Sequence, residues 1–116
     1  MNNSALYVAI AAVAVFLTFQ FLRSRKAPAG VVLEKIRGGA RVIDVRTPGE
    51  FAAGAYPKAR NIPLDALPAR LGDLPRDKPI VLYCASGARS ASAARILKKA
   101  GFADVINAGG LGGMPR

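Results

Sequence analysis

A short apolar run, a loop of small residues and an amphipathic helical pattern follow one another without a break in the second half of the sequence. Residues 80–83 predict a buried strand, and residues 90–100 place apolar side chains on one face and basic or polar ones on the other. The loop between them contains Cys84. A strand that passes through a tight loop directly into a helix is the repeating unit of α/β domains, so this feature restricts the chain to that class.

The segments on either side continue the alternation. Thr47, Pro48 and Glu50 have the spacing of a capping box with proline at the first helical position, which predicts a helix that ends near Gly54. The expected fold is a small α/β domain over residues 31–116, with a central, mainly parallel sheet flanked by helices. Its other expected elements are a helix over 31–37, strands over 41–46, 59–63 and 104–107, helical turns over 64–71, a loop over 72–78 and a glycine-rich tail over 109–116.

Residues 5–22 carry no charge, and only Thr18 and Gln20 interrupt the apolar character of their second half. A helix of this length, at about 1.5 Å per residue, approaches the roughly 30 Å of a bilayer's hydrocarbon core. We therefore expect a transmembrane helix here, between a short N-terminus (1–4) and a basic linker (23–30). A buried core helix is one alternative, but it would need an amphipathic stripe. A cleaved secretory signal is another, because residues 27–29 have the small-x-small form of a cleavage site.

Arg23, Arg25 and Lys26 follow the apolar segment directly. Basic residues at this position resemble a stop signal, and the positive-inside rule places them in the cytoplasm. The expected location is the inner, cytoplasmic membrane, with a single span and the domain facing the cytoplasm. The periplasmic side is the alternative.

From residue 27 onward the chain has 14 Lys or Arg and 7 Asp or Glu, a net charge of +7. These basic residues occur singly, without a dense run or interleaved exposed aromatics, so nucleic acid is the least supported partner. An anionic membrane surface and small anionic substrates remain. One cysteine excludes an internal disulfide, and the absence of histidine removes the usual transition-metal ligand sets, so neither a metal nor a cofactor is expected.

Cys84 is expected at the carboxyl end of a central strand, where open parallel sheets bind their ligands. The small residues from Ala85 to Ala88 let the backbone amides turn toward the sulfur, and Arg89 adds a positive charge. Both features lower the pKa of a thiol, and without a histidine base the activation of a nucleophilic cysteine must be electrostatic. A buried structural cysteine is the alternative, although such a residue needs neither the loop nor the arginine.

Four ordered motifs resemble those of the rhodanese family of single-domain sulfurtransferases. They are residues 44–51 (DVRTPGEF), 54–63 (GAYPKARNIP), 84–90 (CASGARS) and 101–111 (GFADVINAGGL). Residues 107–111 with Met114 and Pro115 particularly resemble the small phage-shock sulfurtransferases of bacteria. The resemblance covers residues 31–115, which is nearly all of the chain after the apolar segment.

The resemblance implies that Cys84 takes a sulfane sulfur from a small anionic donor, thiosulfate or a persulfide, and passes it through a cysteine persulfide to cyanide or a thiol. It implies that the sulfur is bound by a loop formed by Ala85, Ser86, Gly87, Ala88 and Arg89, and that the Arg89 side chain braces this loop or contacts the donor. Phosphatases and arsenate reductases of similar fold use a loop one residue longer, so the six residues from Cys84 to Arg89 favour sulfur.

Asp44, Arg46 and Arg60 are the expected supporting residues. Asp44 and Arg46 are interpreted as structural, with Arg46 pairing with Glu50 to hold the walls of the loop, whereas Arg60 either borders the pocket or lies on the solvated surface. Two departures from the family concern the rim of the pocket and therefore the preference for a donor. Residues 54–59 (GAYPKA) replace the common Gly-His-Ile-Pro-Gly-Ala, and the usual aromatic residue after the final glycines is absent.

Two other functions are weighed against sulfur transfer. One is a non-enzymatic module that carries sulfur or binds a partner at the membrane, and the other is a weak phosphatase or arsenate reductase. The presence of both Cys84 and Arg89 favours an enzyme. The short loop, and Tyr83 in place of a histidine before the cysteine, disfavour the phosphatase.

Overall fold

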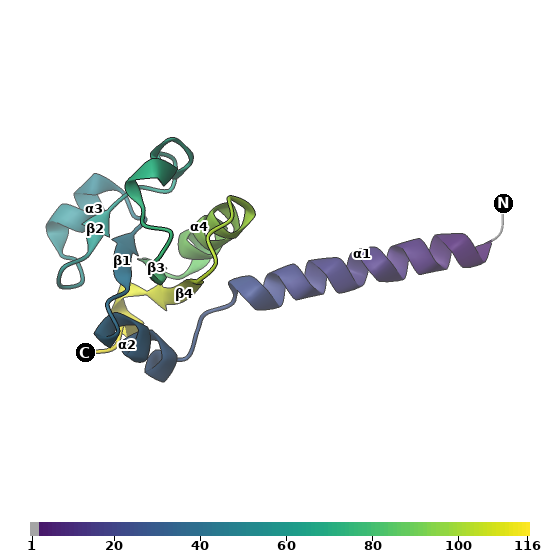
Figure 1. Ribbon diagram of the computed structural model, residues 1–116, viewed down its shortest axis with the longest axis horizontal. Helices are drawn as coiled ribbons and strands as arrows, with labels where there is room; N and C mark the ends of the chain where they lie inside the picture. Colours follow the sequence, from purple (N-terminus) through teal and green to yellow (C-terminus); the bar gives the residue numbers. More distant parts are fainter. Residues whose placement is uncertain (1–2) are drawn as a thin grey trace.

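Four parallel strands form one sheet in the order β2-β1-β3-β4 (Figure 1). The computed structural model describes the backbone of residues 3–116 and the side chains of residues 3–19 and 25–116. The strands are β1 (Arg41–Asp44), β2 (Arg60–Asn61), β3 (Ile80–Cys84) and β4 (Val105–Gly110). The expected parallel α/β sheet is therefore present, and β3 lies in its interior.

The strand register places the carboxyl ends of three strands side by side. Asp44 at the end of β1 pairs with Tyr83, and Cys84 at the end of β3 pairs with Gly110 at the end of β4. The register shifts between Leu82 and Cys84, which marks an irregularity in the ladder just before the loop. The carboxyl ends of β1, β3 and β4 consequently meet at one edge of the sheet, where Brändén's rule expects a ligand.

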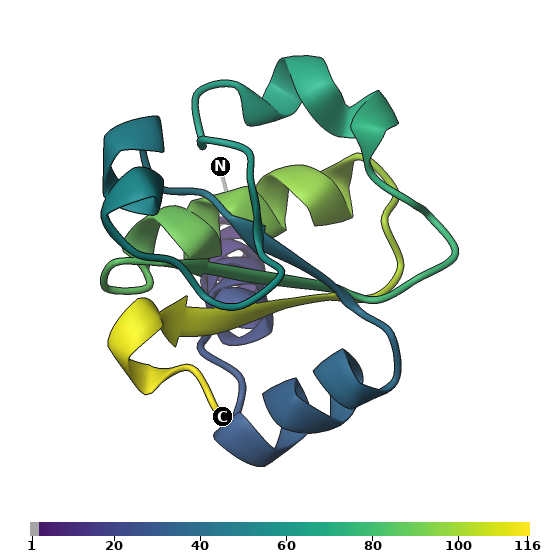
Figure 2. The same cartoon turned by 90° about the vertical axis from the view of Figure 1, so that its left-hand side faces the viewer.

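Helices cover both faces of this sheet. Figure 2 shows α4 (Ala88–Lys99) on one face and α2 (Ala29–Arg37) on the other. Because side chains alternate along a strand, Leu82 and Cys84 pack on the α4 side, whereas Val81 and Tyr83 pack on the α2 side. All five residues of β3 are buried, as expected for a strand covered on both faces.

The remaining elements are short. They are α3 (Pro48–Ala53), the 3-10 segment η1 (Leu67–Asp73) and the 3-10 turn η2 (Leu111–Gly113). The predicted capping box at the start of α3 is confirmed, because Thr47 accepts a hydrogen bond from the Glu50 amide and Glu50 accepts one from the Thr47 amide. The helical turns expected over 64–71 form η1 instead, with a kink at Arg70.

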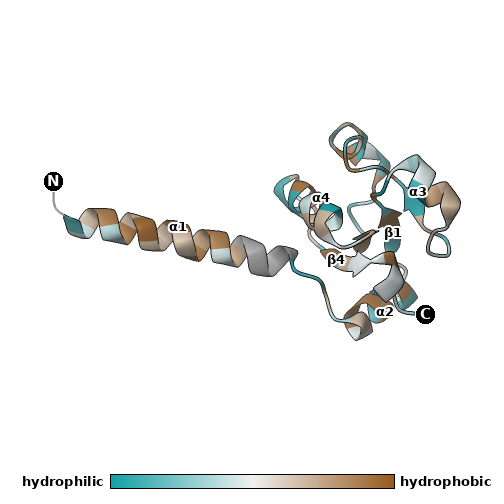
Figure 3. Cartoon of the chain, turned by 180° about the vertical axis from the view of Figure 1, so that it is seen from behind, coloured by the Kyte–Doolittle hydropathy of each residue, from teal (hydrophilic) through white to brown (hydrophobic). Residues whose placement is uncertain are grey.

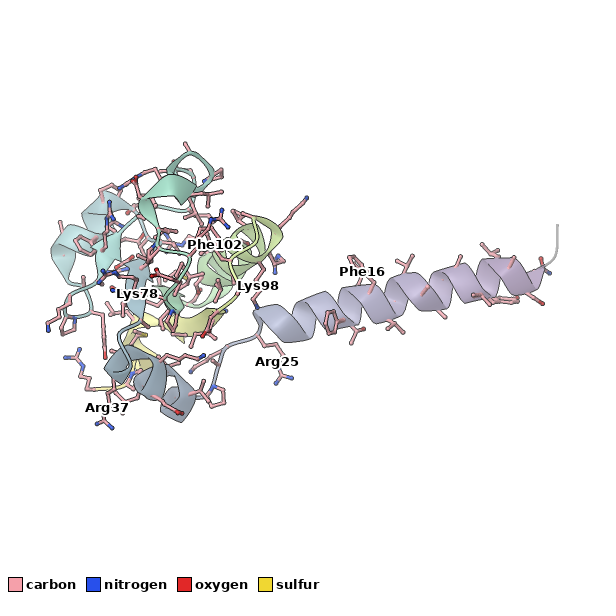
Figure 4. All side chains as sticks on the ribbon, in the orientation of Figure 1. Phe16, Arg25, Arg37, Lys78, Lys98 and Phe102 are labelled. Carbon is pink, nitrogen blue, oxygen red and sulfur yellow. The ribbon has the colours of Figure 1, made fainter. Side chains whose placement is uncertain are left out.

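The N-terminal helix α1 (Asn3–Ser24) extends away from the domain in Figure 1, and Figure 3 shows its apolar colouring. Its described apolar side chains are exposed, among them Phe16, which Figure 4 shows projecting from the helix. A membrane span needs about 20 consecutive apolar residues. In the part of the chain that the structure describes, no helix combines enough length with enough apolar character to cross a membrane. The prediction of a transmembrane helix over 5–22 is therefore wrong, and the cellular location inferred from it stays a prediction.

The segment between α1 and α2 joins the edge of the sheet. Lys26 forms a parallel bridge with Asn107, and the Ala27 amide donates to the Asn107 carbonyl at 2.7 Å. The linker thus pairs with the outer side of β4 instead of passing freely into solvent.

Candidate functional site

Cys84 lies at the centre of a tight loop that points hydrogen-bond donors at its sulfur. The Gly87 amide lies 3.0 Å from Sγ and the Ser90 amide 3.4 Å. The Ser90 hydroxyl oxygen also lies 3.4 Å from Sγ, and either atom of this contact can be the donor. The side chain is fully buried, and it is the free thiol expected from a single cysteine. The loop therefore surrounds the sulfur with the groups that stabilise an anion.

The pKa of the Cys84 thiol reflects two opposed influences. Burial raises it, because a thiolate is poorly solvated inside the protein. Hydrogen bonds from the Ser90 side chain and from the amides of Ser90, Ser86 and Gly87 lower it, and together they prevail, so that the pKa falls below its ordinary value. The thiolate is thus stabilised by donors from the loop and the first turn of α4, without a histidine base.

Two glycines allow this loop to close. Gly87, which precedes α4, has φ of 101°, a left-handed conformation that side chains disfavour. Gly110 at the end of β4 lies against the loop so closely that an added Cβ would stand 2.5 Å from the Ala85 carbonyl oxygen. The closing glycines of the sequence are therefore needed for contact between β4 and the cysteine loop.

Arg89 braces the loop from the side. Its guanidinium makes a two-pronged ion pair with Glu50 of α3, with Nη1–Oε1 at 2.7 Å and Nη2–Oε2 at 3.0 Å. Hydrogen bonds from Arg89 and then from Thr47 lower the pKa of Glu50 to about 2. The predicted pairing of Glu50 with Arg46 is therefore wrong, because Glu50 pairs with Arg89, which comes from a distant part of the chain.

Asp44 and Arg46 form a buried pair at the end of β1. Arg46 Nη2 lies 2.7 Å from Asp44 Oδ2 and 2.6 Å from the Gly54 carbonyl oxygen, so the pair ties the end of β1 to the end of α3. The Arg46 guanidinium also lies 5.7 Å from the centre of the Tyr83 ring. Burial and then Asp44 raise the pKa of Tyr83 to about 12. These contacts agree with the structural interpretation of the two residues, and their roles stay a prediction.

Arg60 lies away from Cys84. It sits on the edge strand β2, with β1 between it and β3, and its side chain is 3.6 Å from Asp73. It lines a separate cavity of about 830 Å³ together with residues 39–43 and 72–75. The structure therefore brings the loop 85–89 to the cysteine and places Asp44 and Arg46 at the end of the neighbouring strand β1, beside Tyr83, but it places Arg60 elsewhere.

Three polar residues that contact the sulfur or the segment 87–90 are absent from the site residues expected from the sequence: Glu50, Ser90 and Asn107. Ser90 Oγ lies 2.6 Å from Asn107 Oδ1, and both side chains are buried. The position of Ser90 in the first turn of the helix after Cys84 was a usable signal. Asn107 belongs to the closing motif noted in the sequence, but only the contacts of β4 with the loop reveal that its side chain meets Ser90 and Gly87.

Known proteins share the sequence pattern of this chain. The family model described as "Rhodanese-like domain" matches residues 29–113. The chain belongs to the rhodanese-like domain family. The resemblance that the four motifs indicated is thus confirmed, and the matched range includes Cys84, its loop and the closing glycines.

This rhodanese-like chain is similar to several known proteins. The uncharacterized protein YqhL of Bacillus subtilis is 34% identical over 110 residues, which cover 92% of this chain and 87% of that protein. The thiosulfate sulfurtransferase PspE of Escherichia coli is 38% identical over 71 residues, covering 60% and 68%. A solved structure titled "rhodanese with anions from E. coli" is 33% identical with a TM-score of 0.62, and the match covers 66% of this chain and 95% of that one.

Proposed function

We propose that this rhodanese-like protein is an enzyme that transfers sulfane sulfur through a persulfide on Cys84. The observation that carries the proposal is the ring of donors around the Cys84 sulfur, with the Gly87 amide at 3.0 Å and the Ser90 amide at 3.4 Å. Such donors favour the thiolate that attacks the donor molecule, and they offer hydrogen bonds to the sulfur that it receives.

With thiosulfate as donor, the Cys84 thiolate attacks the outer sulfur. A new S–S bond forms to Cys84, the original S–S bond breaks, and sulfite leaves with the electron pair. In the second step cyanide or an acceptor thiolate attacks the outer sulfur of the persulfide, and Cys84 departs as a thiolate. A persulfide donor follows the same course with a thiolate as the leaving group. Thiosulfate is supported by the similarity to PspE, which bears that activity in its name.

Arg89 is proposed to act by holding the loop, because its guanidinium is committed to Glu50 by two hydrogen bonds. The amides of residues 85–89 are proposed to bind the transferred sulfur. Asp44 and Arg46 are proposed to hold the neighbouring wall of the site through their contact with Gly54.

The test is incubation of the full chain with thiosulfate, followed by intact-mass measurement. We expect a gain of one sulfur atom that cyanide removes as thiocyanate and that Cys84→Ser abolishes. A parallel incubation with a small-molecule persulfide, measured in the same way, shows which of the two donor classes the protein uses. Failure to gain sulfur from either donor would rule out the proposed function, whereas a stable gain without turnover by any acceptor would indicate a sulfur carrier instead of an enzyme.

A further inference from the structure

Asn107 links the first turn of α4 to the last strand through its side-chain amide. Its Oδ1 accepts a hydrogen bond from the Gly109 amide at 2.9 Å and lies 2.6 Å from Ser90 Oγ, while its Nδ2 donates to the Gly87 carbonyl at 3.3 Å. A backbone amide can only donate, so the atom that faces Gly109 must be the oxygen. This contact fixes the orientation of the amide group.

The fixed amide determines where the Ser90 proton lies. A serine hydroxyl has one proton, and Asn107 Oδ1 has none, so the 2.6 Å hydrogen bond must use the proton of Ser90. The lone pairs of Ser90 Oγ then face Cys84 Sγ at 3.4 Å, and a protonated thiol can donate to them. The Gly87 and Gly109 carbonyl oxygens also lie within reach of the hydroxyl, at 3.1 Å and 3.5 Å, but Asn107 Oδ1 is the nearest acceptor. A thiolate receives a hydrogen bond from Ser90 only if the hydroxyl turns away from these acceptors, first of all from Asn107.

The backbone of Asn107 is held on both sides. It pairs with Leu82 of β3 on one side, and on the other its carbonyl accepts from the Ala27 amide at 2.7 Å. The residue is also buried, with 5% of its surface exposed. Asn107 therefore stays in place while the Ser90 hydroxyl rotates.

We propose that Asn107 is a positioning residue that holds the Ser90 proton away from Cys84 while the sulfur is neutral and releases it when the sulfur becomes an anion. In the proposed sulfur transfer, on which this step rests, the acceptor takes the outer sulfur and the electron pair of the S–S bond remains on Cys84. The Ser90 hydroxyl then turns from Asn107 Oδ1 to the new thiolate. No proton is transferred, because only a hydrogen bond changes its acceptor.

The surrounding charges are the same in every variant of the test. They are the Asp44 and Arg46 pair that follows β1, Glu50 of α3 with Arg89 of α4, and Lys26 of the linker beside Gly109. The pKa difference between wild type and Asn107→Leu therefore reports the local hydrogen bonds and not a rearranged ion pair, whereas Asn107→Asp also adds a negative charge.

The experiment is a pH titration of the thiolate absorbance of the reduced full chain, with Cys84→Ser as the blank. Because Cys84 is the only cysteine, the signal belongs to it alone. Asn107→Leu removes the nearest acceptor that competes for the Ser90 proton and leaves only the longer contacts to the Gly87 and Gly109 carbonyls. It should lower the thiol pKa by roughly half a unit, since a hydrogen bond to an anion is worth more than one to a neutral group. Asn107→Asp should raise the pKa by about one unit, because a carboxylate holds the Ser90 proton and repels the thiolate.

Ser90→Ala provides the decisive background. In it, Asn107→Leu should no longer lower the pKa, and a shift that persists would overturn the proposal. The control is Asn61→Leu, which removes amide hydrogen bonds to the carbonyl oxygens of Asp44 and Arg46 and should leave the thiol pKa unchanged. If Asn107→Leu does not fold, the isosteric Asn107→Asp is compared in the wild-type and Ser90→Ala backgrounds. An equal rise of the thiol pKa in both would refute the role, because it would come from charge repulsion alone. If the shifts occur but no sulfur is transferred, the positioning role holds and the proposed function fails.

Discussion

Arg89 on α4 forms a bidentate ion pair with Glu50 on α3, with Nη1–Oε1 at 2.7 Å and Nη2–Oε2 at 3.0 Å, although the two residues are 39 positions apart in the sequence. The pair links the helix that begins after the cysteine loop to the helix that begins after β1. Because the cysteine loop leads directly into α4, this ion pair also ties the loop to α3.

The first prediction concerns this brace. Arg89→Met should reduce the rate constant for persulfide formation by about tenfold or more, because a misplaced loop misaligns the attacking sulfur. Glu50→Gln should reduce it in the same direction, as measured by rapid mixing with thiosulfate and intact mass. Arg70→Met, which disrupts an exposed pair with Asp73, is the control. A normal rate in Glu50→Gln would show that Arg89 acts through its own charge and not as a brace.

The second prediction concerns acid stability. The pKa of Glu50 is about 2 in the folded protein, below its ordinary value of 4.5, so the folded state binds this proton less readily than the unfolded state. The stability that results is fully present above about pH 4.5 and is lost as the pH falls toward about 2. Urea midpoints should therefore separate wild type from Glu50→Gln near neutral pH and converge near pH 2. A separation that stays constant over this range would contradict the assignment.

The third prediction concerns the closing glycines. Gly110→Ala would place a Cβ 2.5 Å from the Ala85 carbonyl oxygen, which the backbone of the loop cannot avoid without moving. We expect a loss of about 1–3 kcal/mol in the free energy of unfolding, together with slower persulfide formation. Gly112→Ala is the matched control, because nothing lies within 4 Å of its Cβ position. Equal effects of the two substitutions would show that the close approach is unimportant.

The fourth prediction concerns the buried ion pair. Arg46→Met leaves the carboxylate of Asp44 buried without its partner and should cost about 3–5 kcal/mol in the free energy of unfolding, measured by chemical denaturation. The double variant Asp44→Asn with Arg46→Met should recover part of this loss, because no uncompensated charge remains. If the double variant is as unstable as the sum of both single variants, the two residues do not act as a pair.

Much of the fold follows from local sequence signals. The strand 80–84, the amphipathic helix after it and the capping box at Thr47 depend on residues close together in the chain, and all three are present. The last strand is longer than expected and continues through Gly109 and Gly110. Glycine has a low intrinsic preference for strands, so only its partner Cys84 across the sheet explains this extension.

The polar contacts of the site were harder to predict. Glu50 was assigned to Arg46, which is closer in sequence, but the helix α3 presents it to Arg89. Arg46 instead turns back to Asp44, two residues before it. Long side chains can reach several partners, and the choice among them depends on how the elements pack in three dimensions. For the same reason the sequence does not predict the contact of Asn107 with Ser90, because the two residues are 17 positions apart.

The pairing of the linker with β4 covers part of the outer edge of the sheet, where a second copy of the chain could otherwise add a strand. An unpaired outer strand is a template on which a second chain can add a strand, and such edges promote aggregation. Here the Ala27 amide occupies the Asn107 carbonyl at the middle of that strand. A chain shortened to begin at α2 would open this edge, and the exposed strand would be the first place where two copies could join.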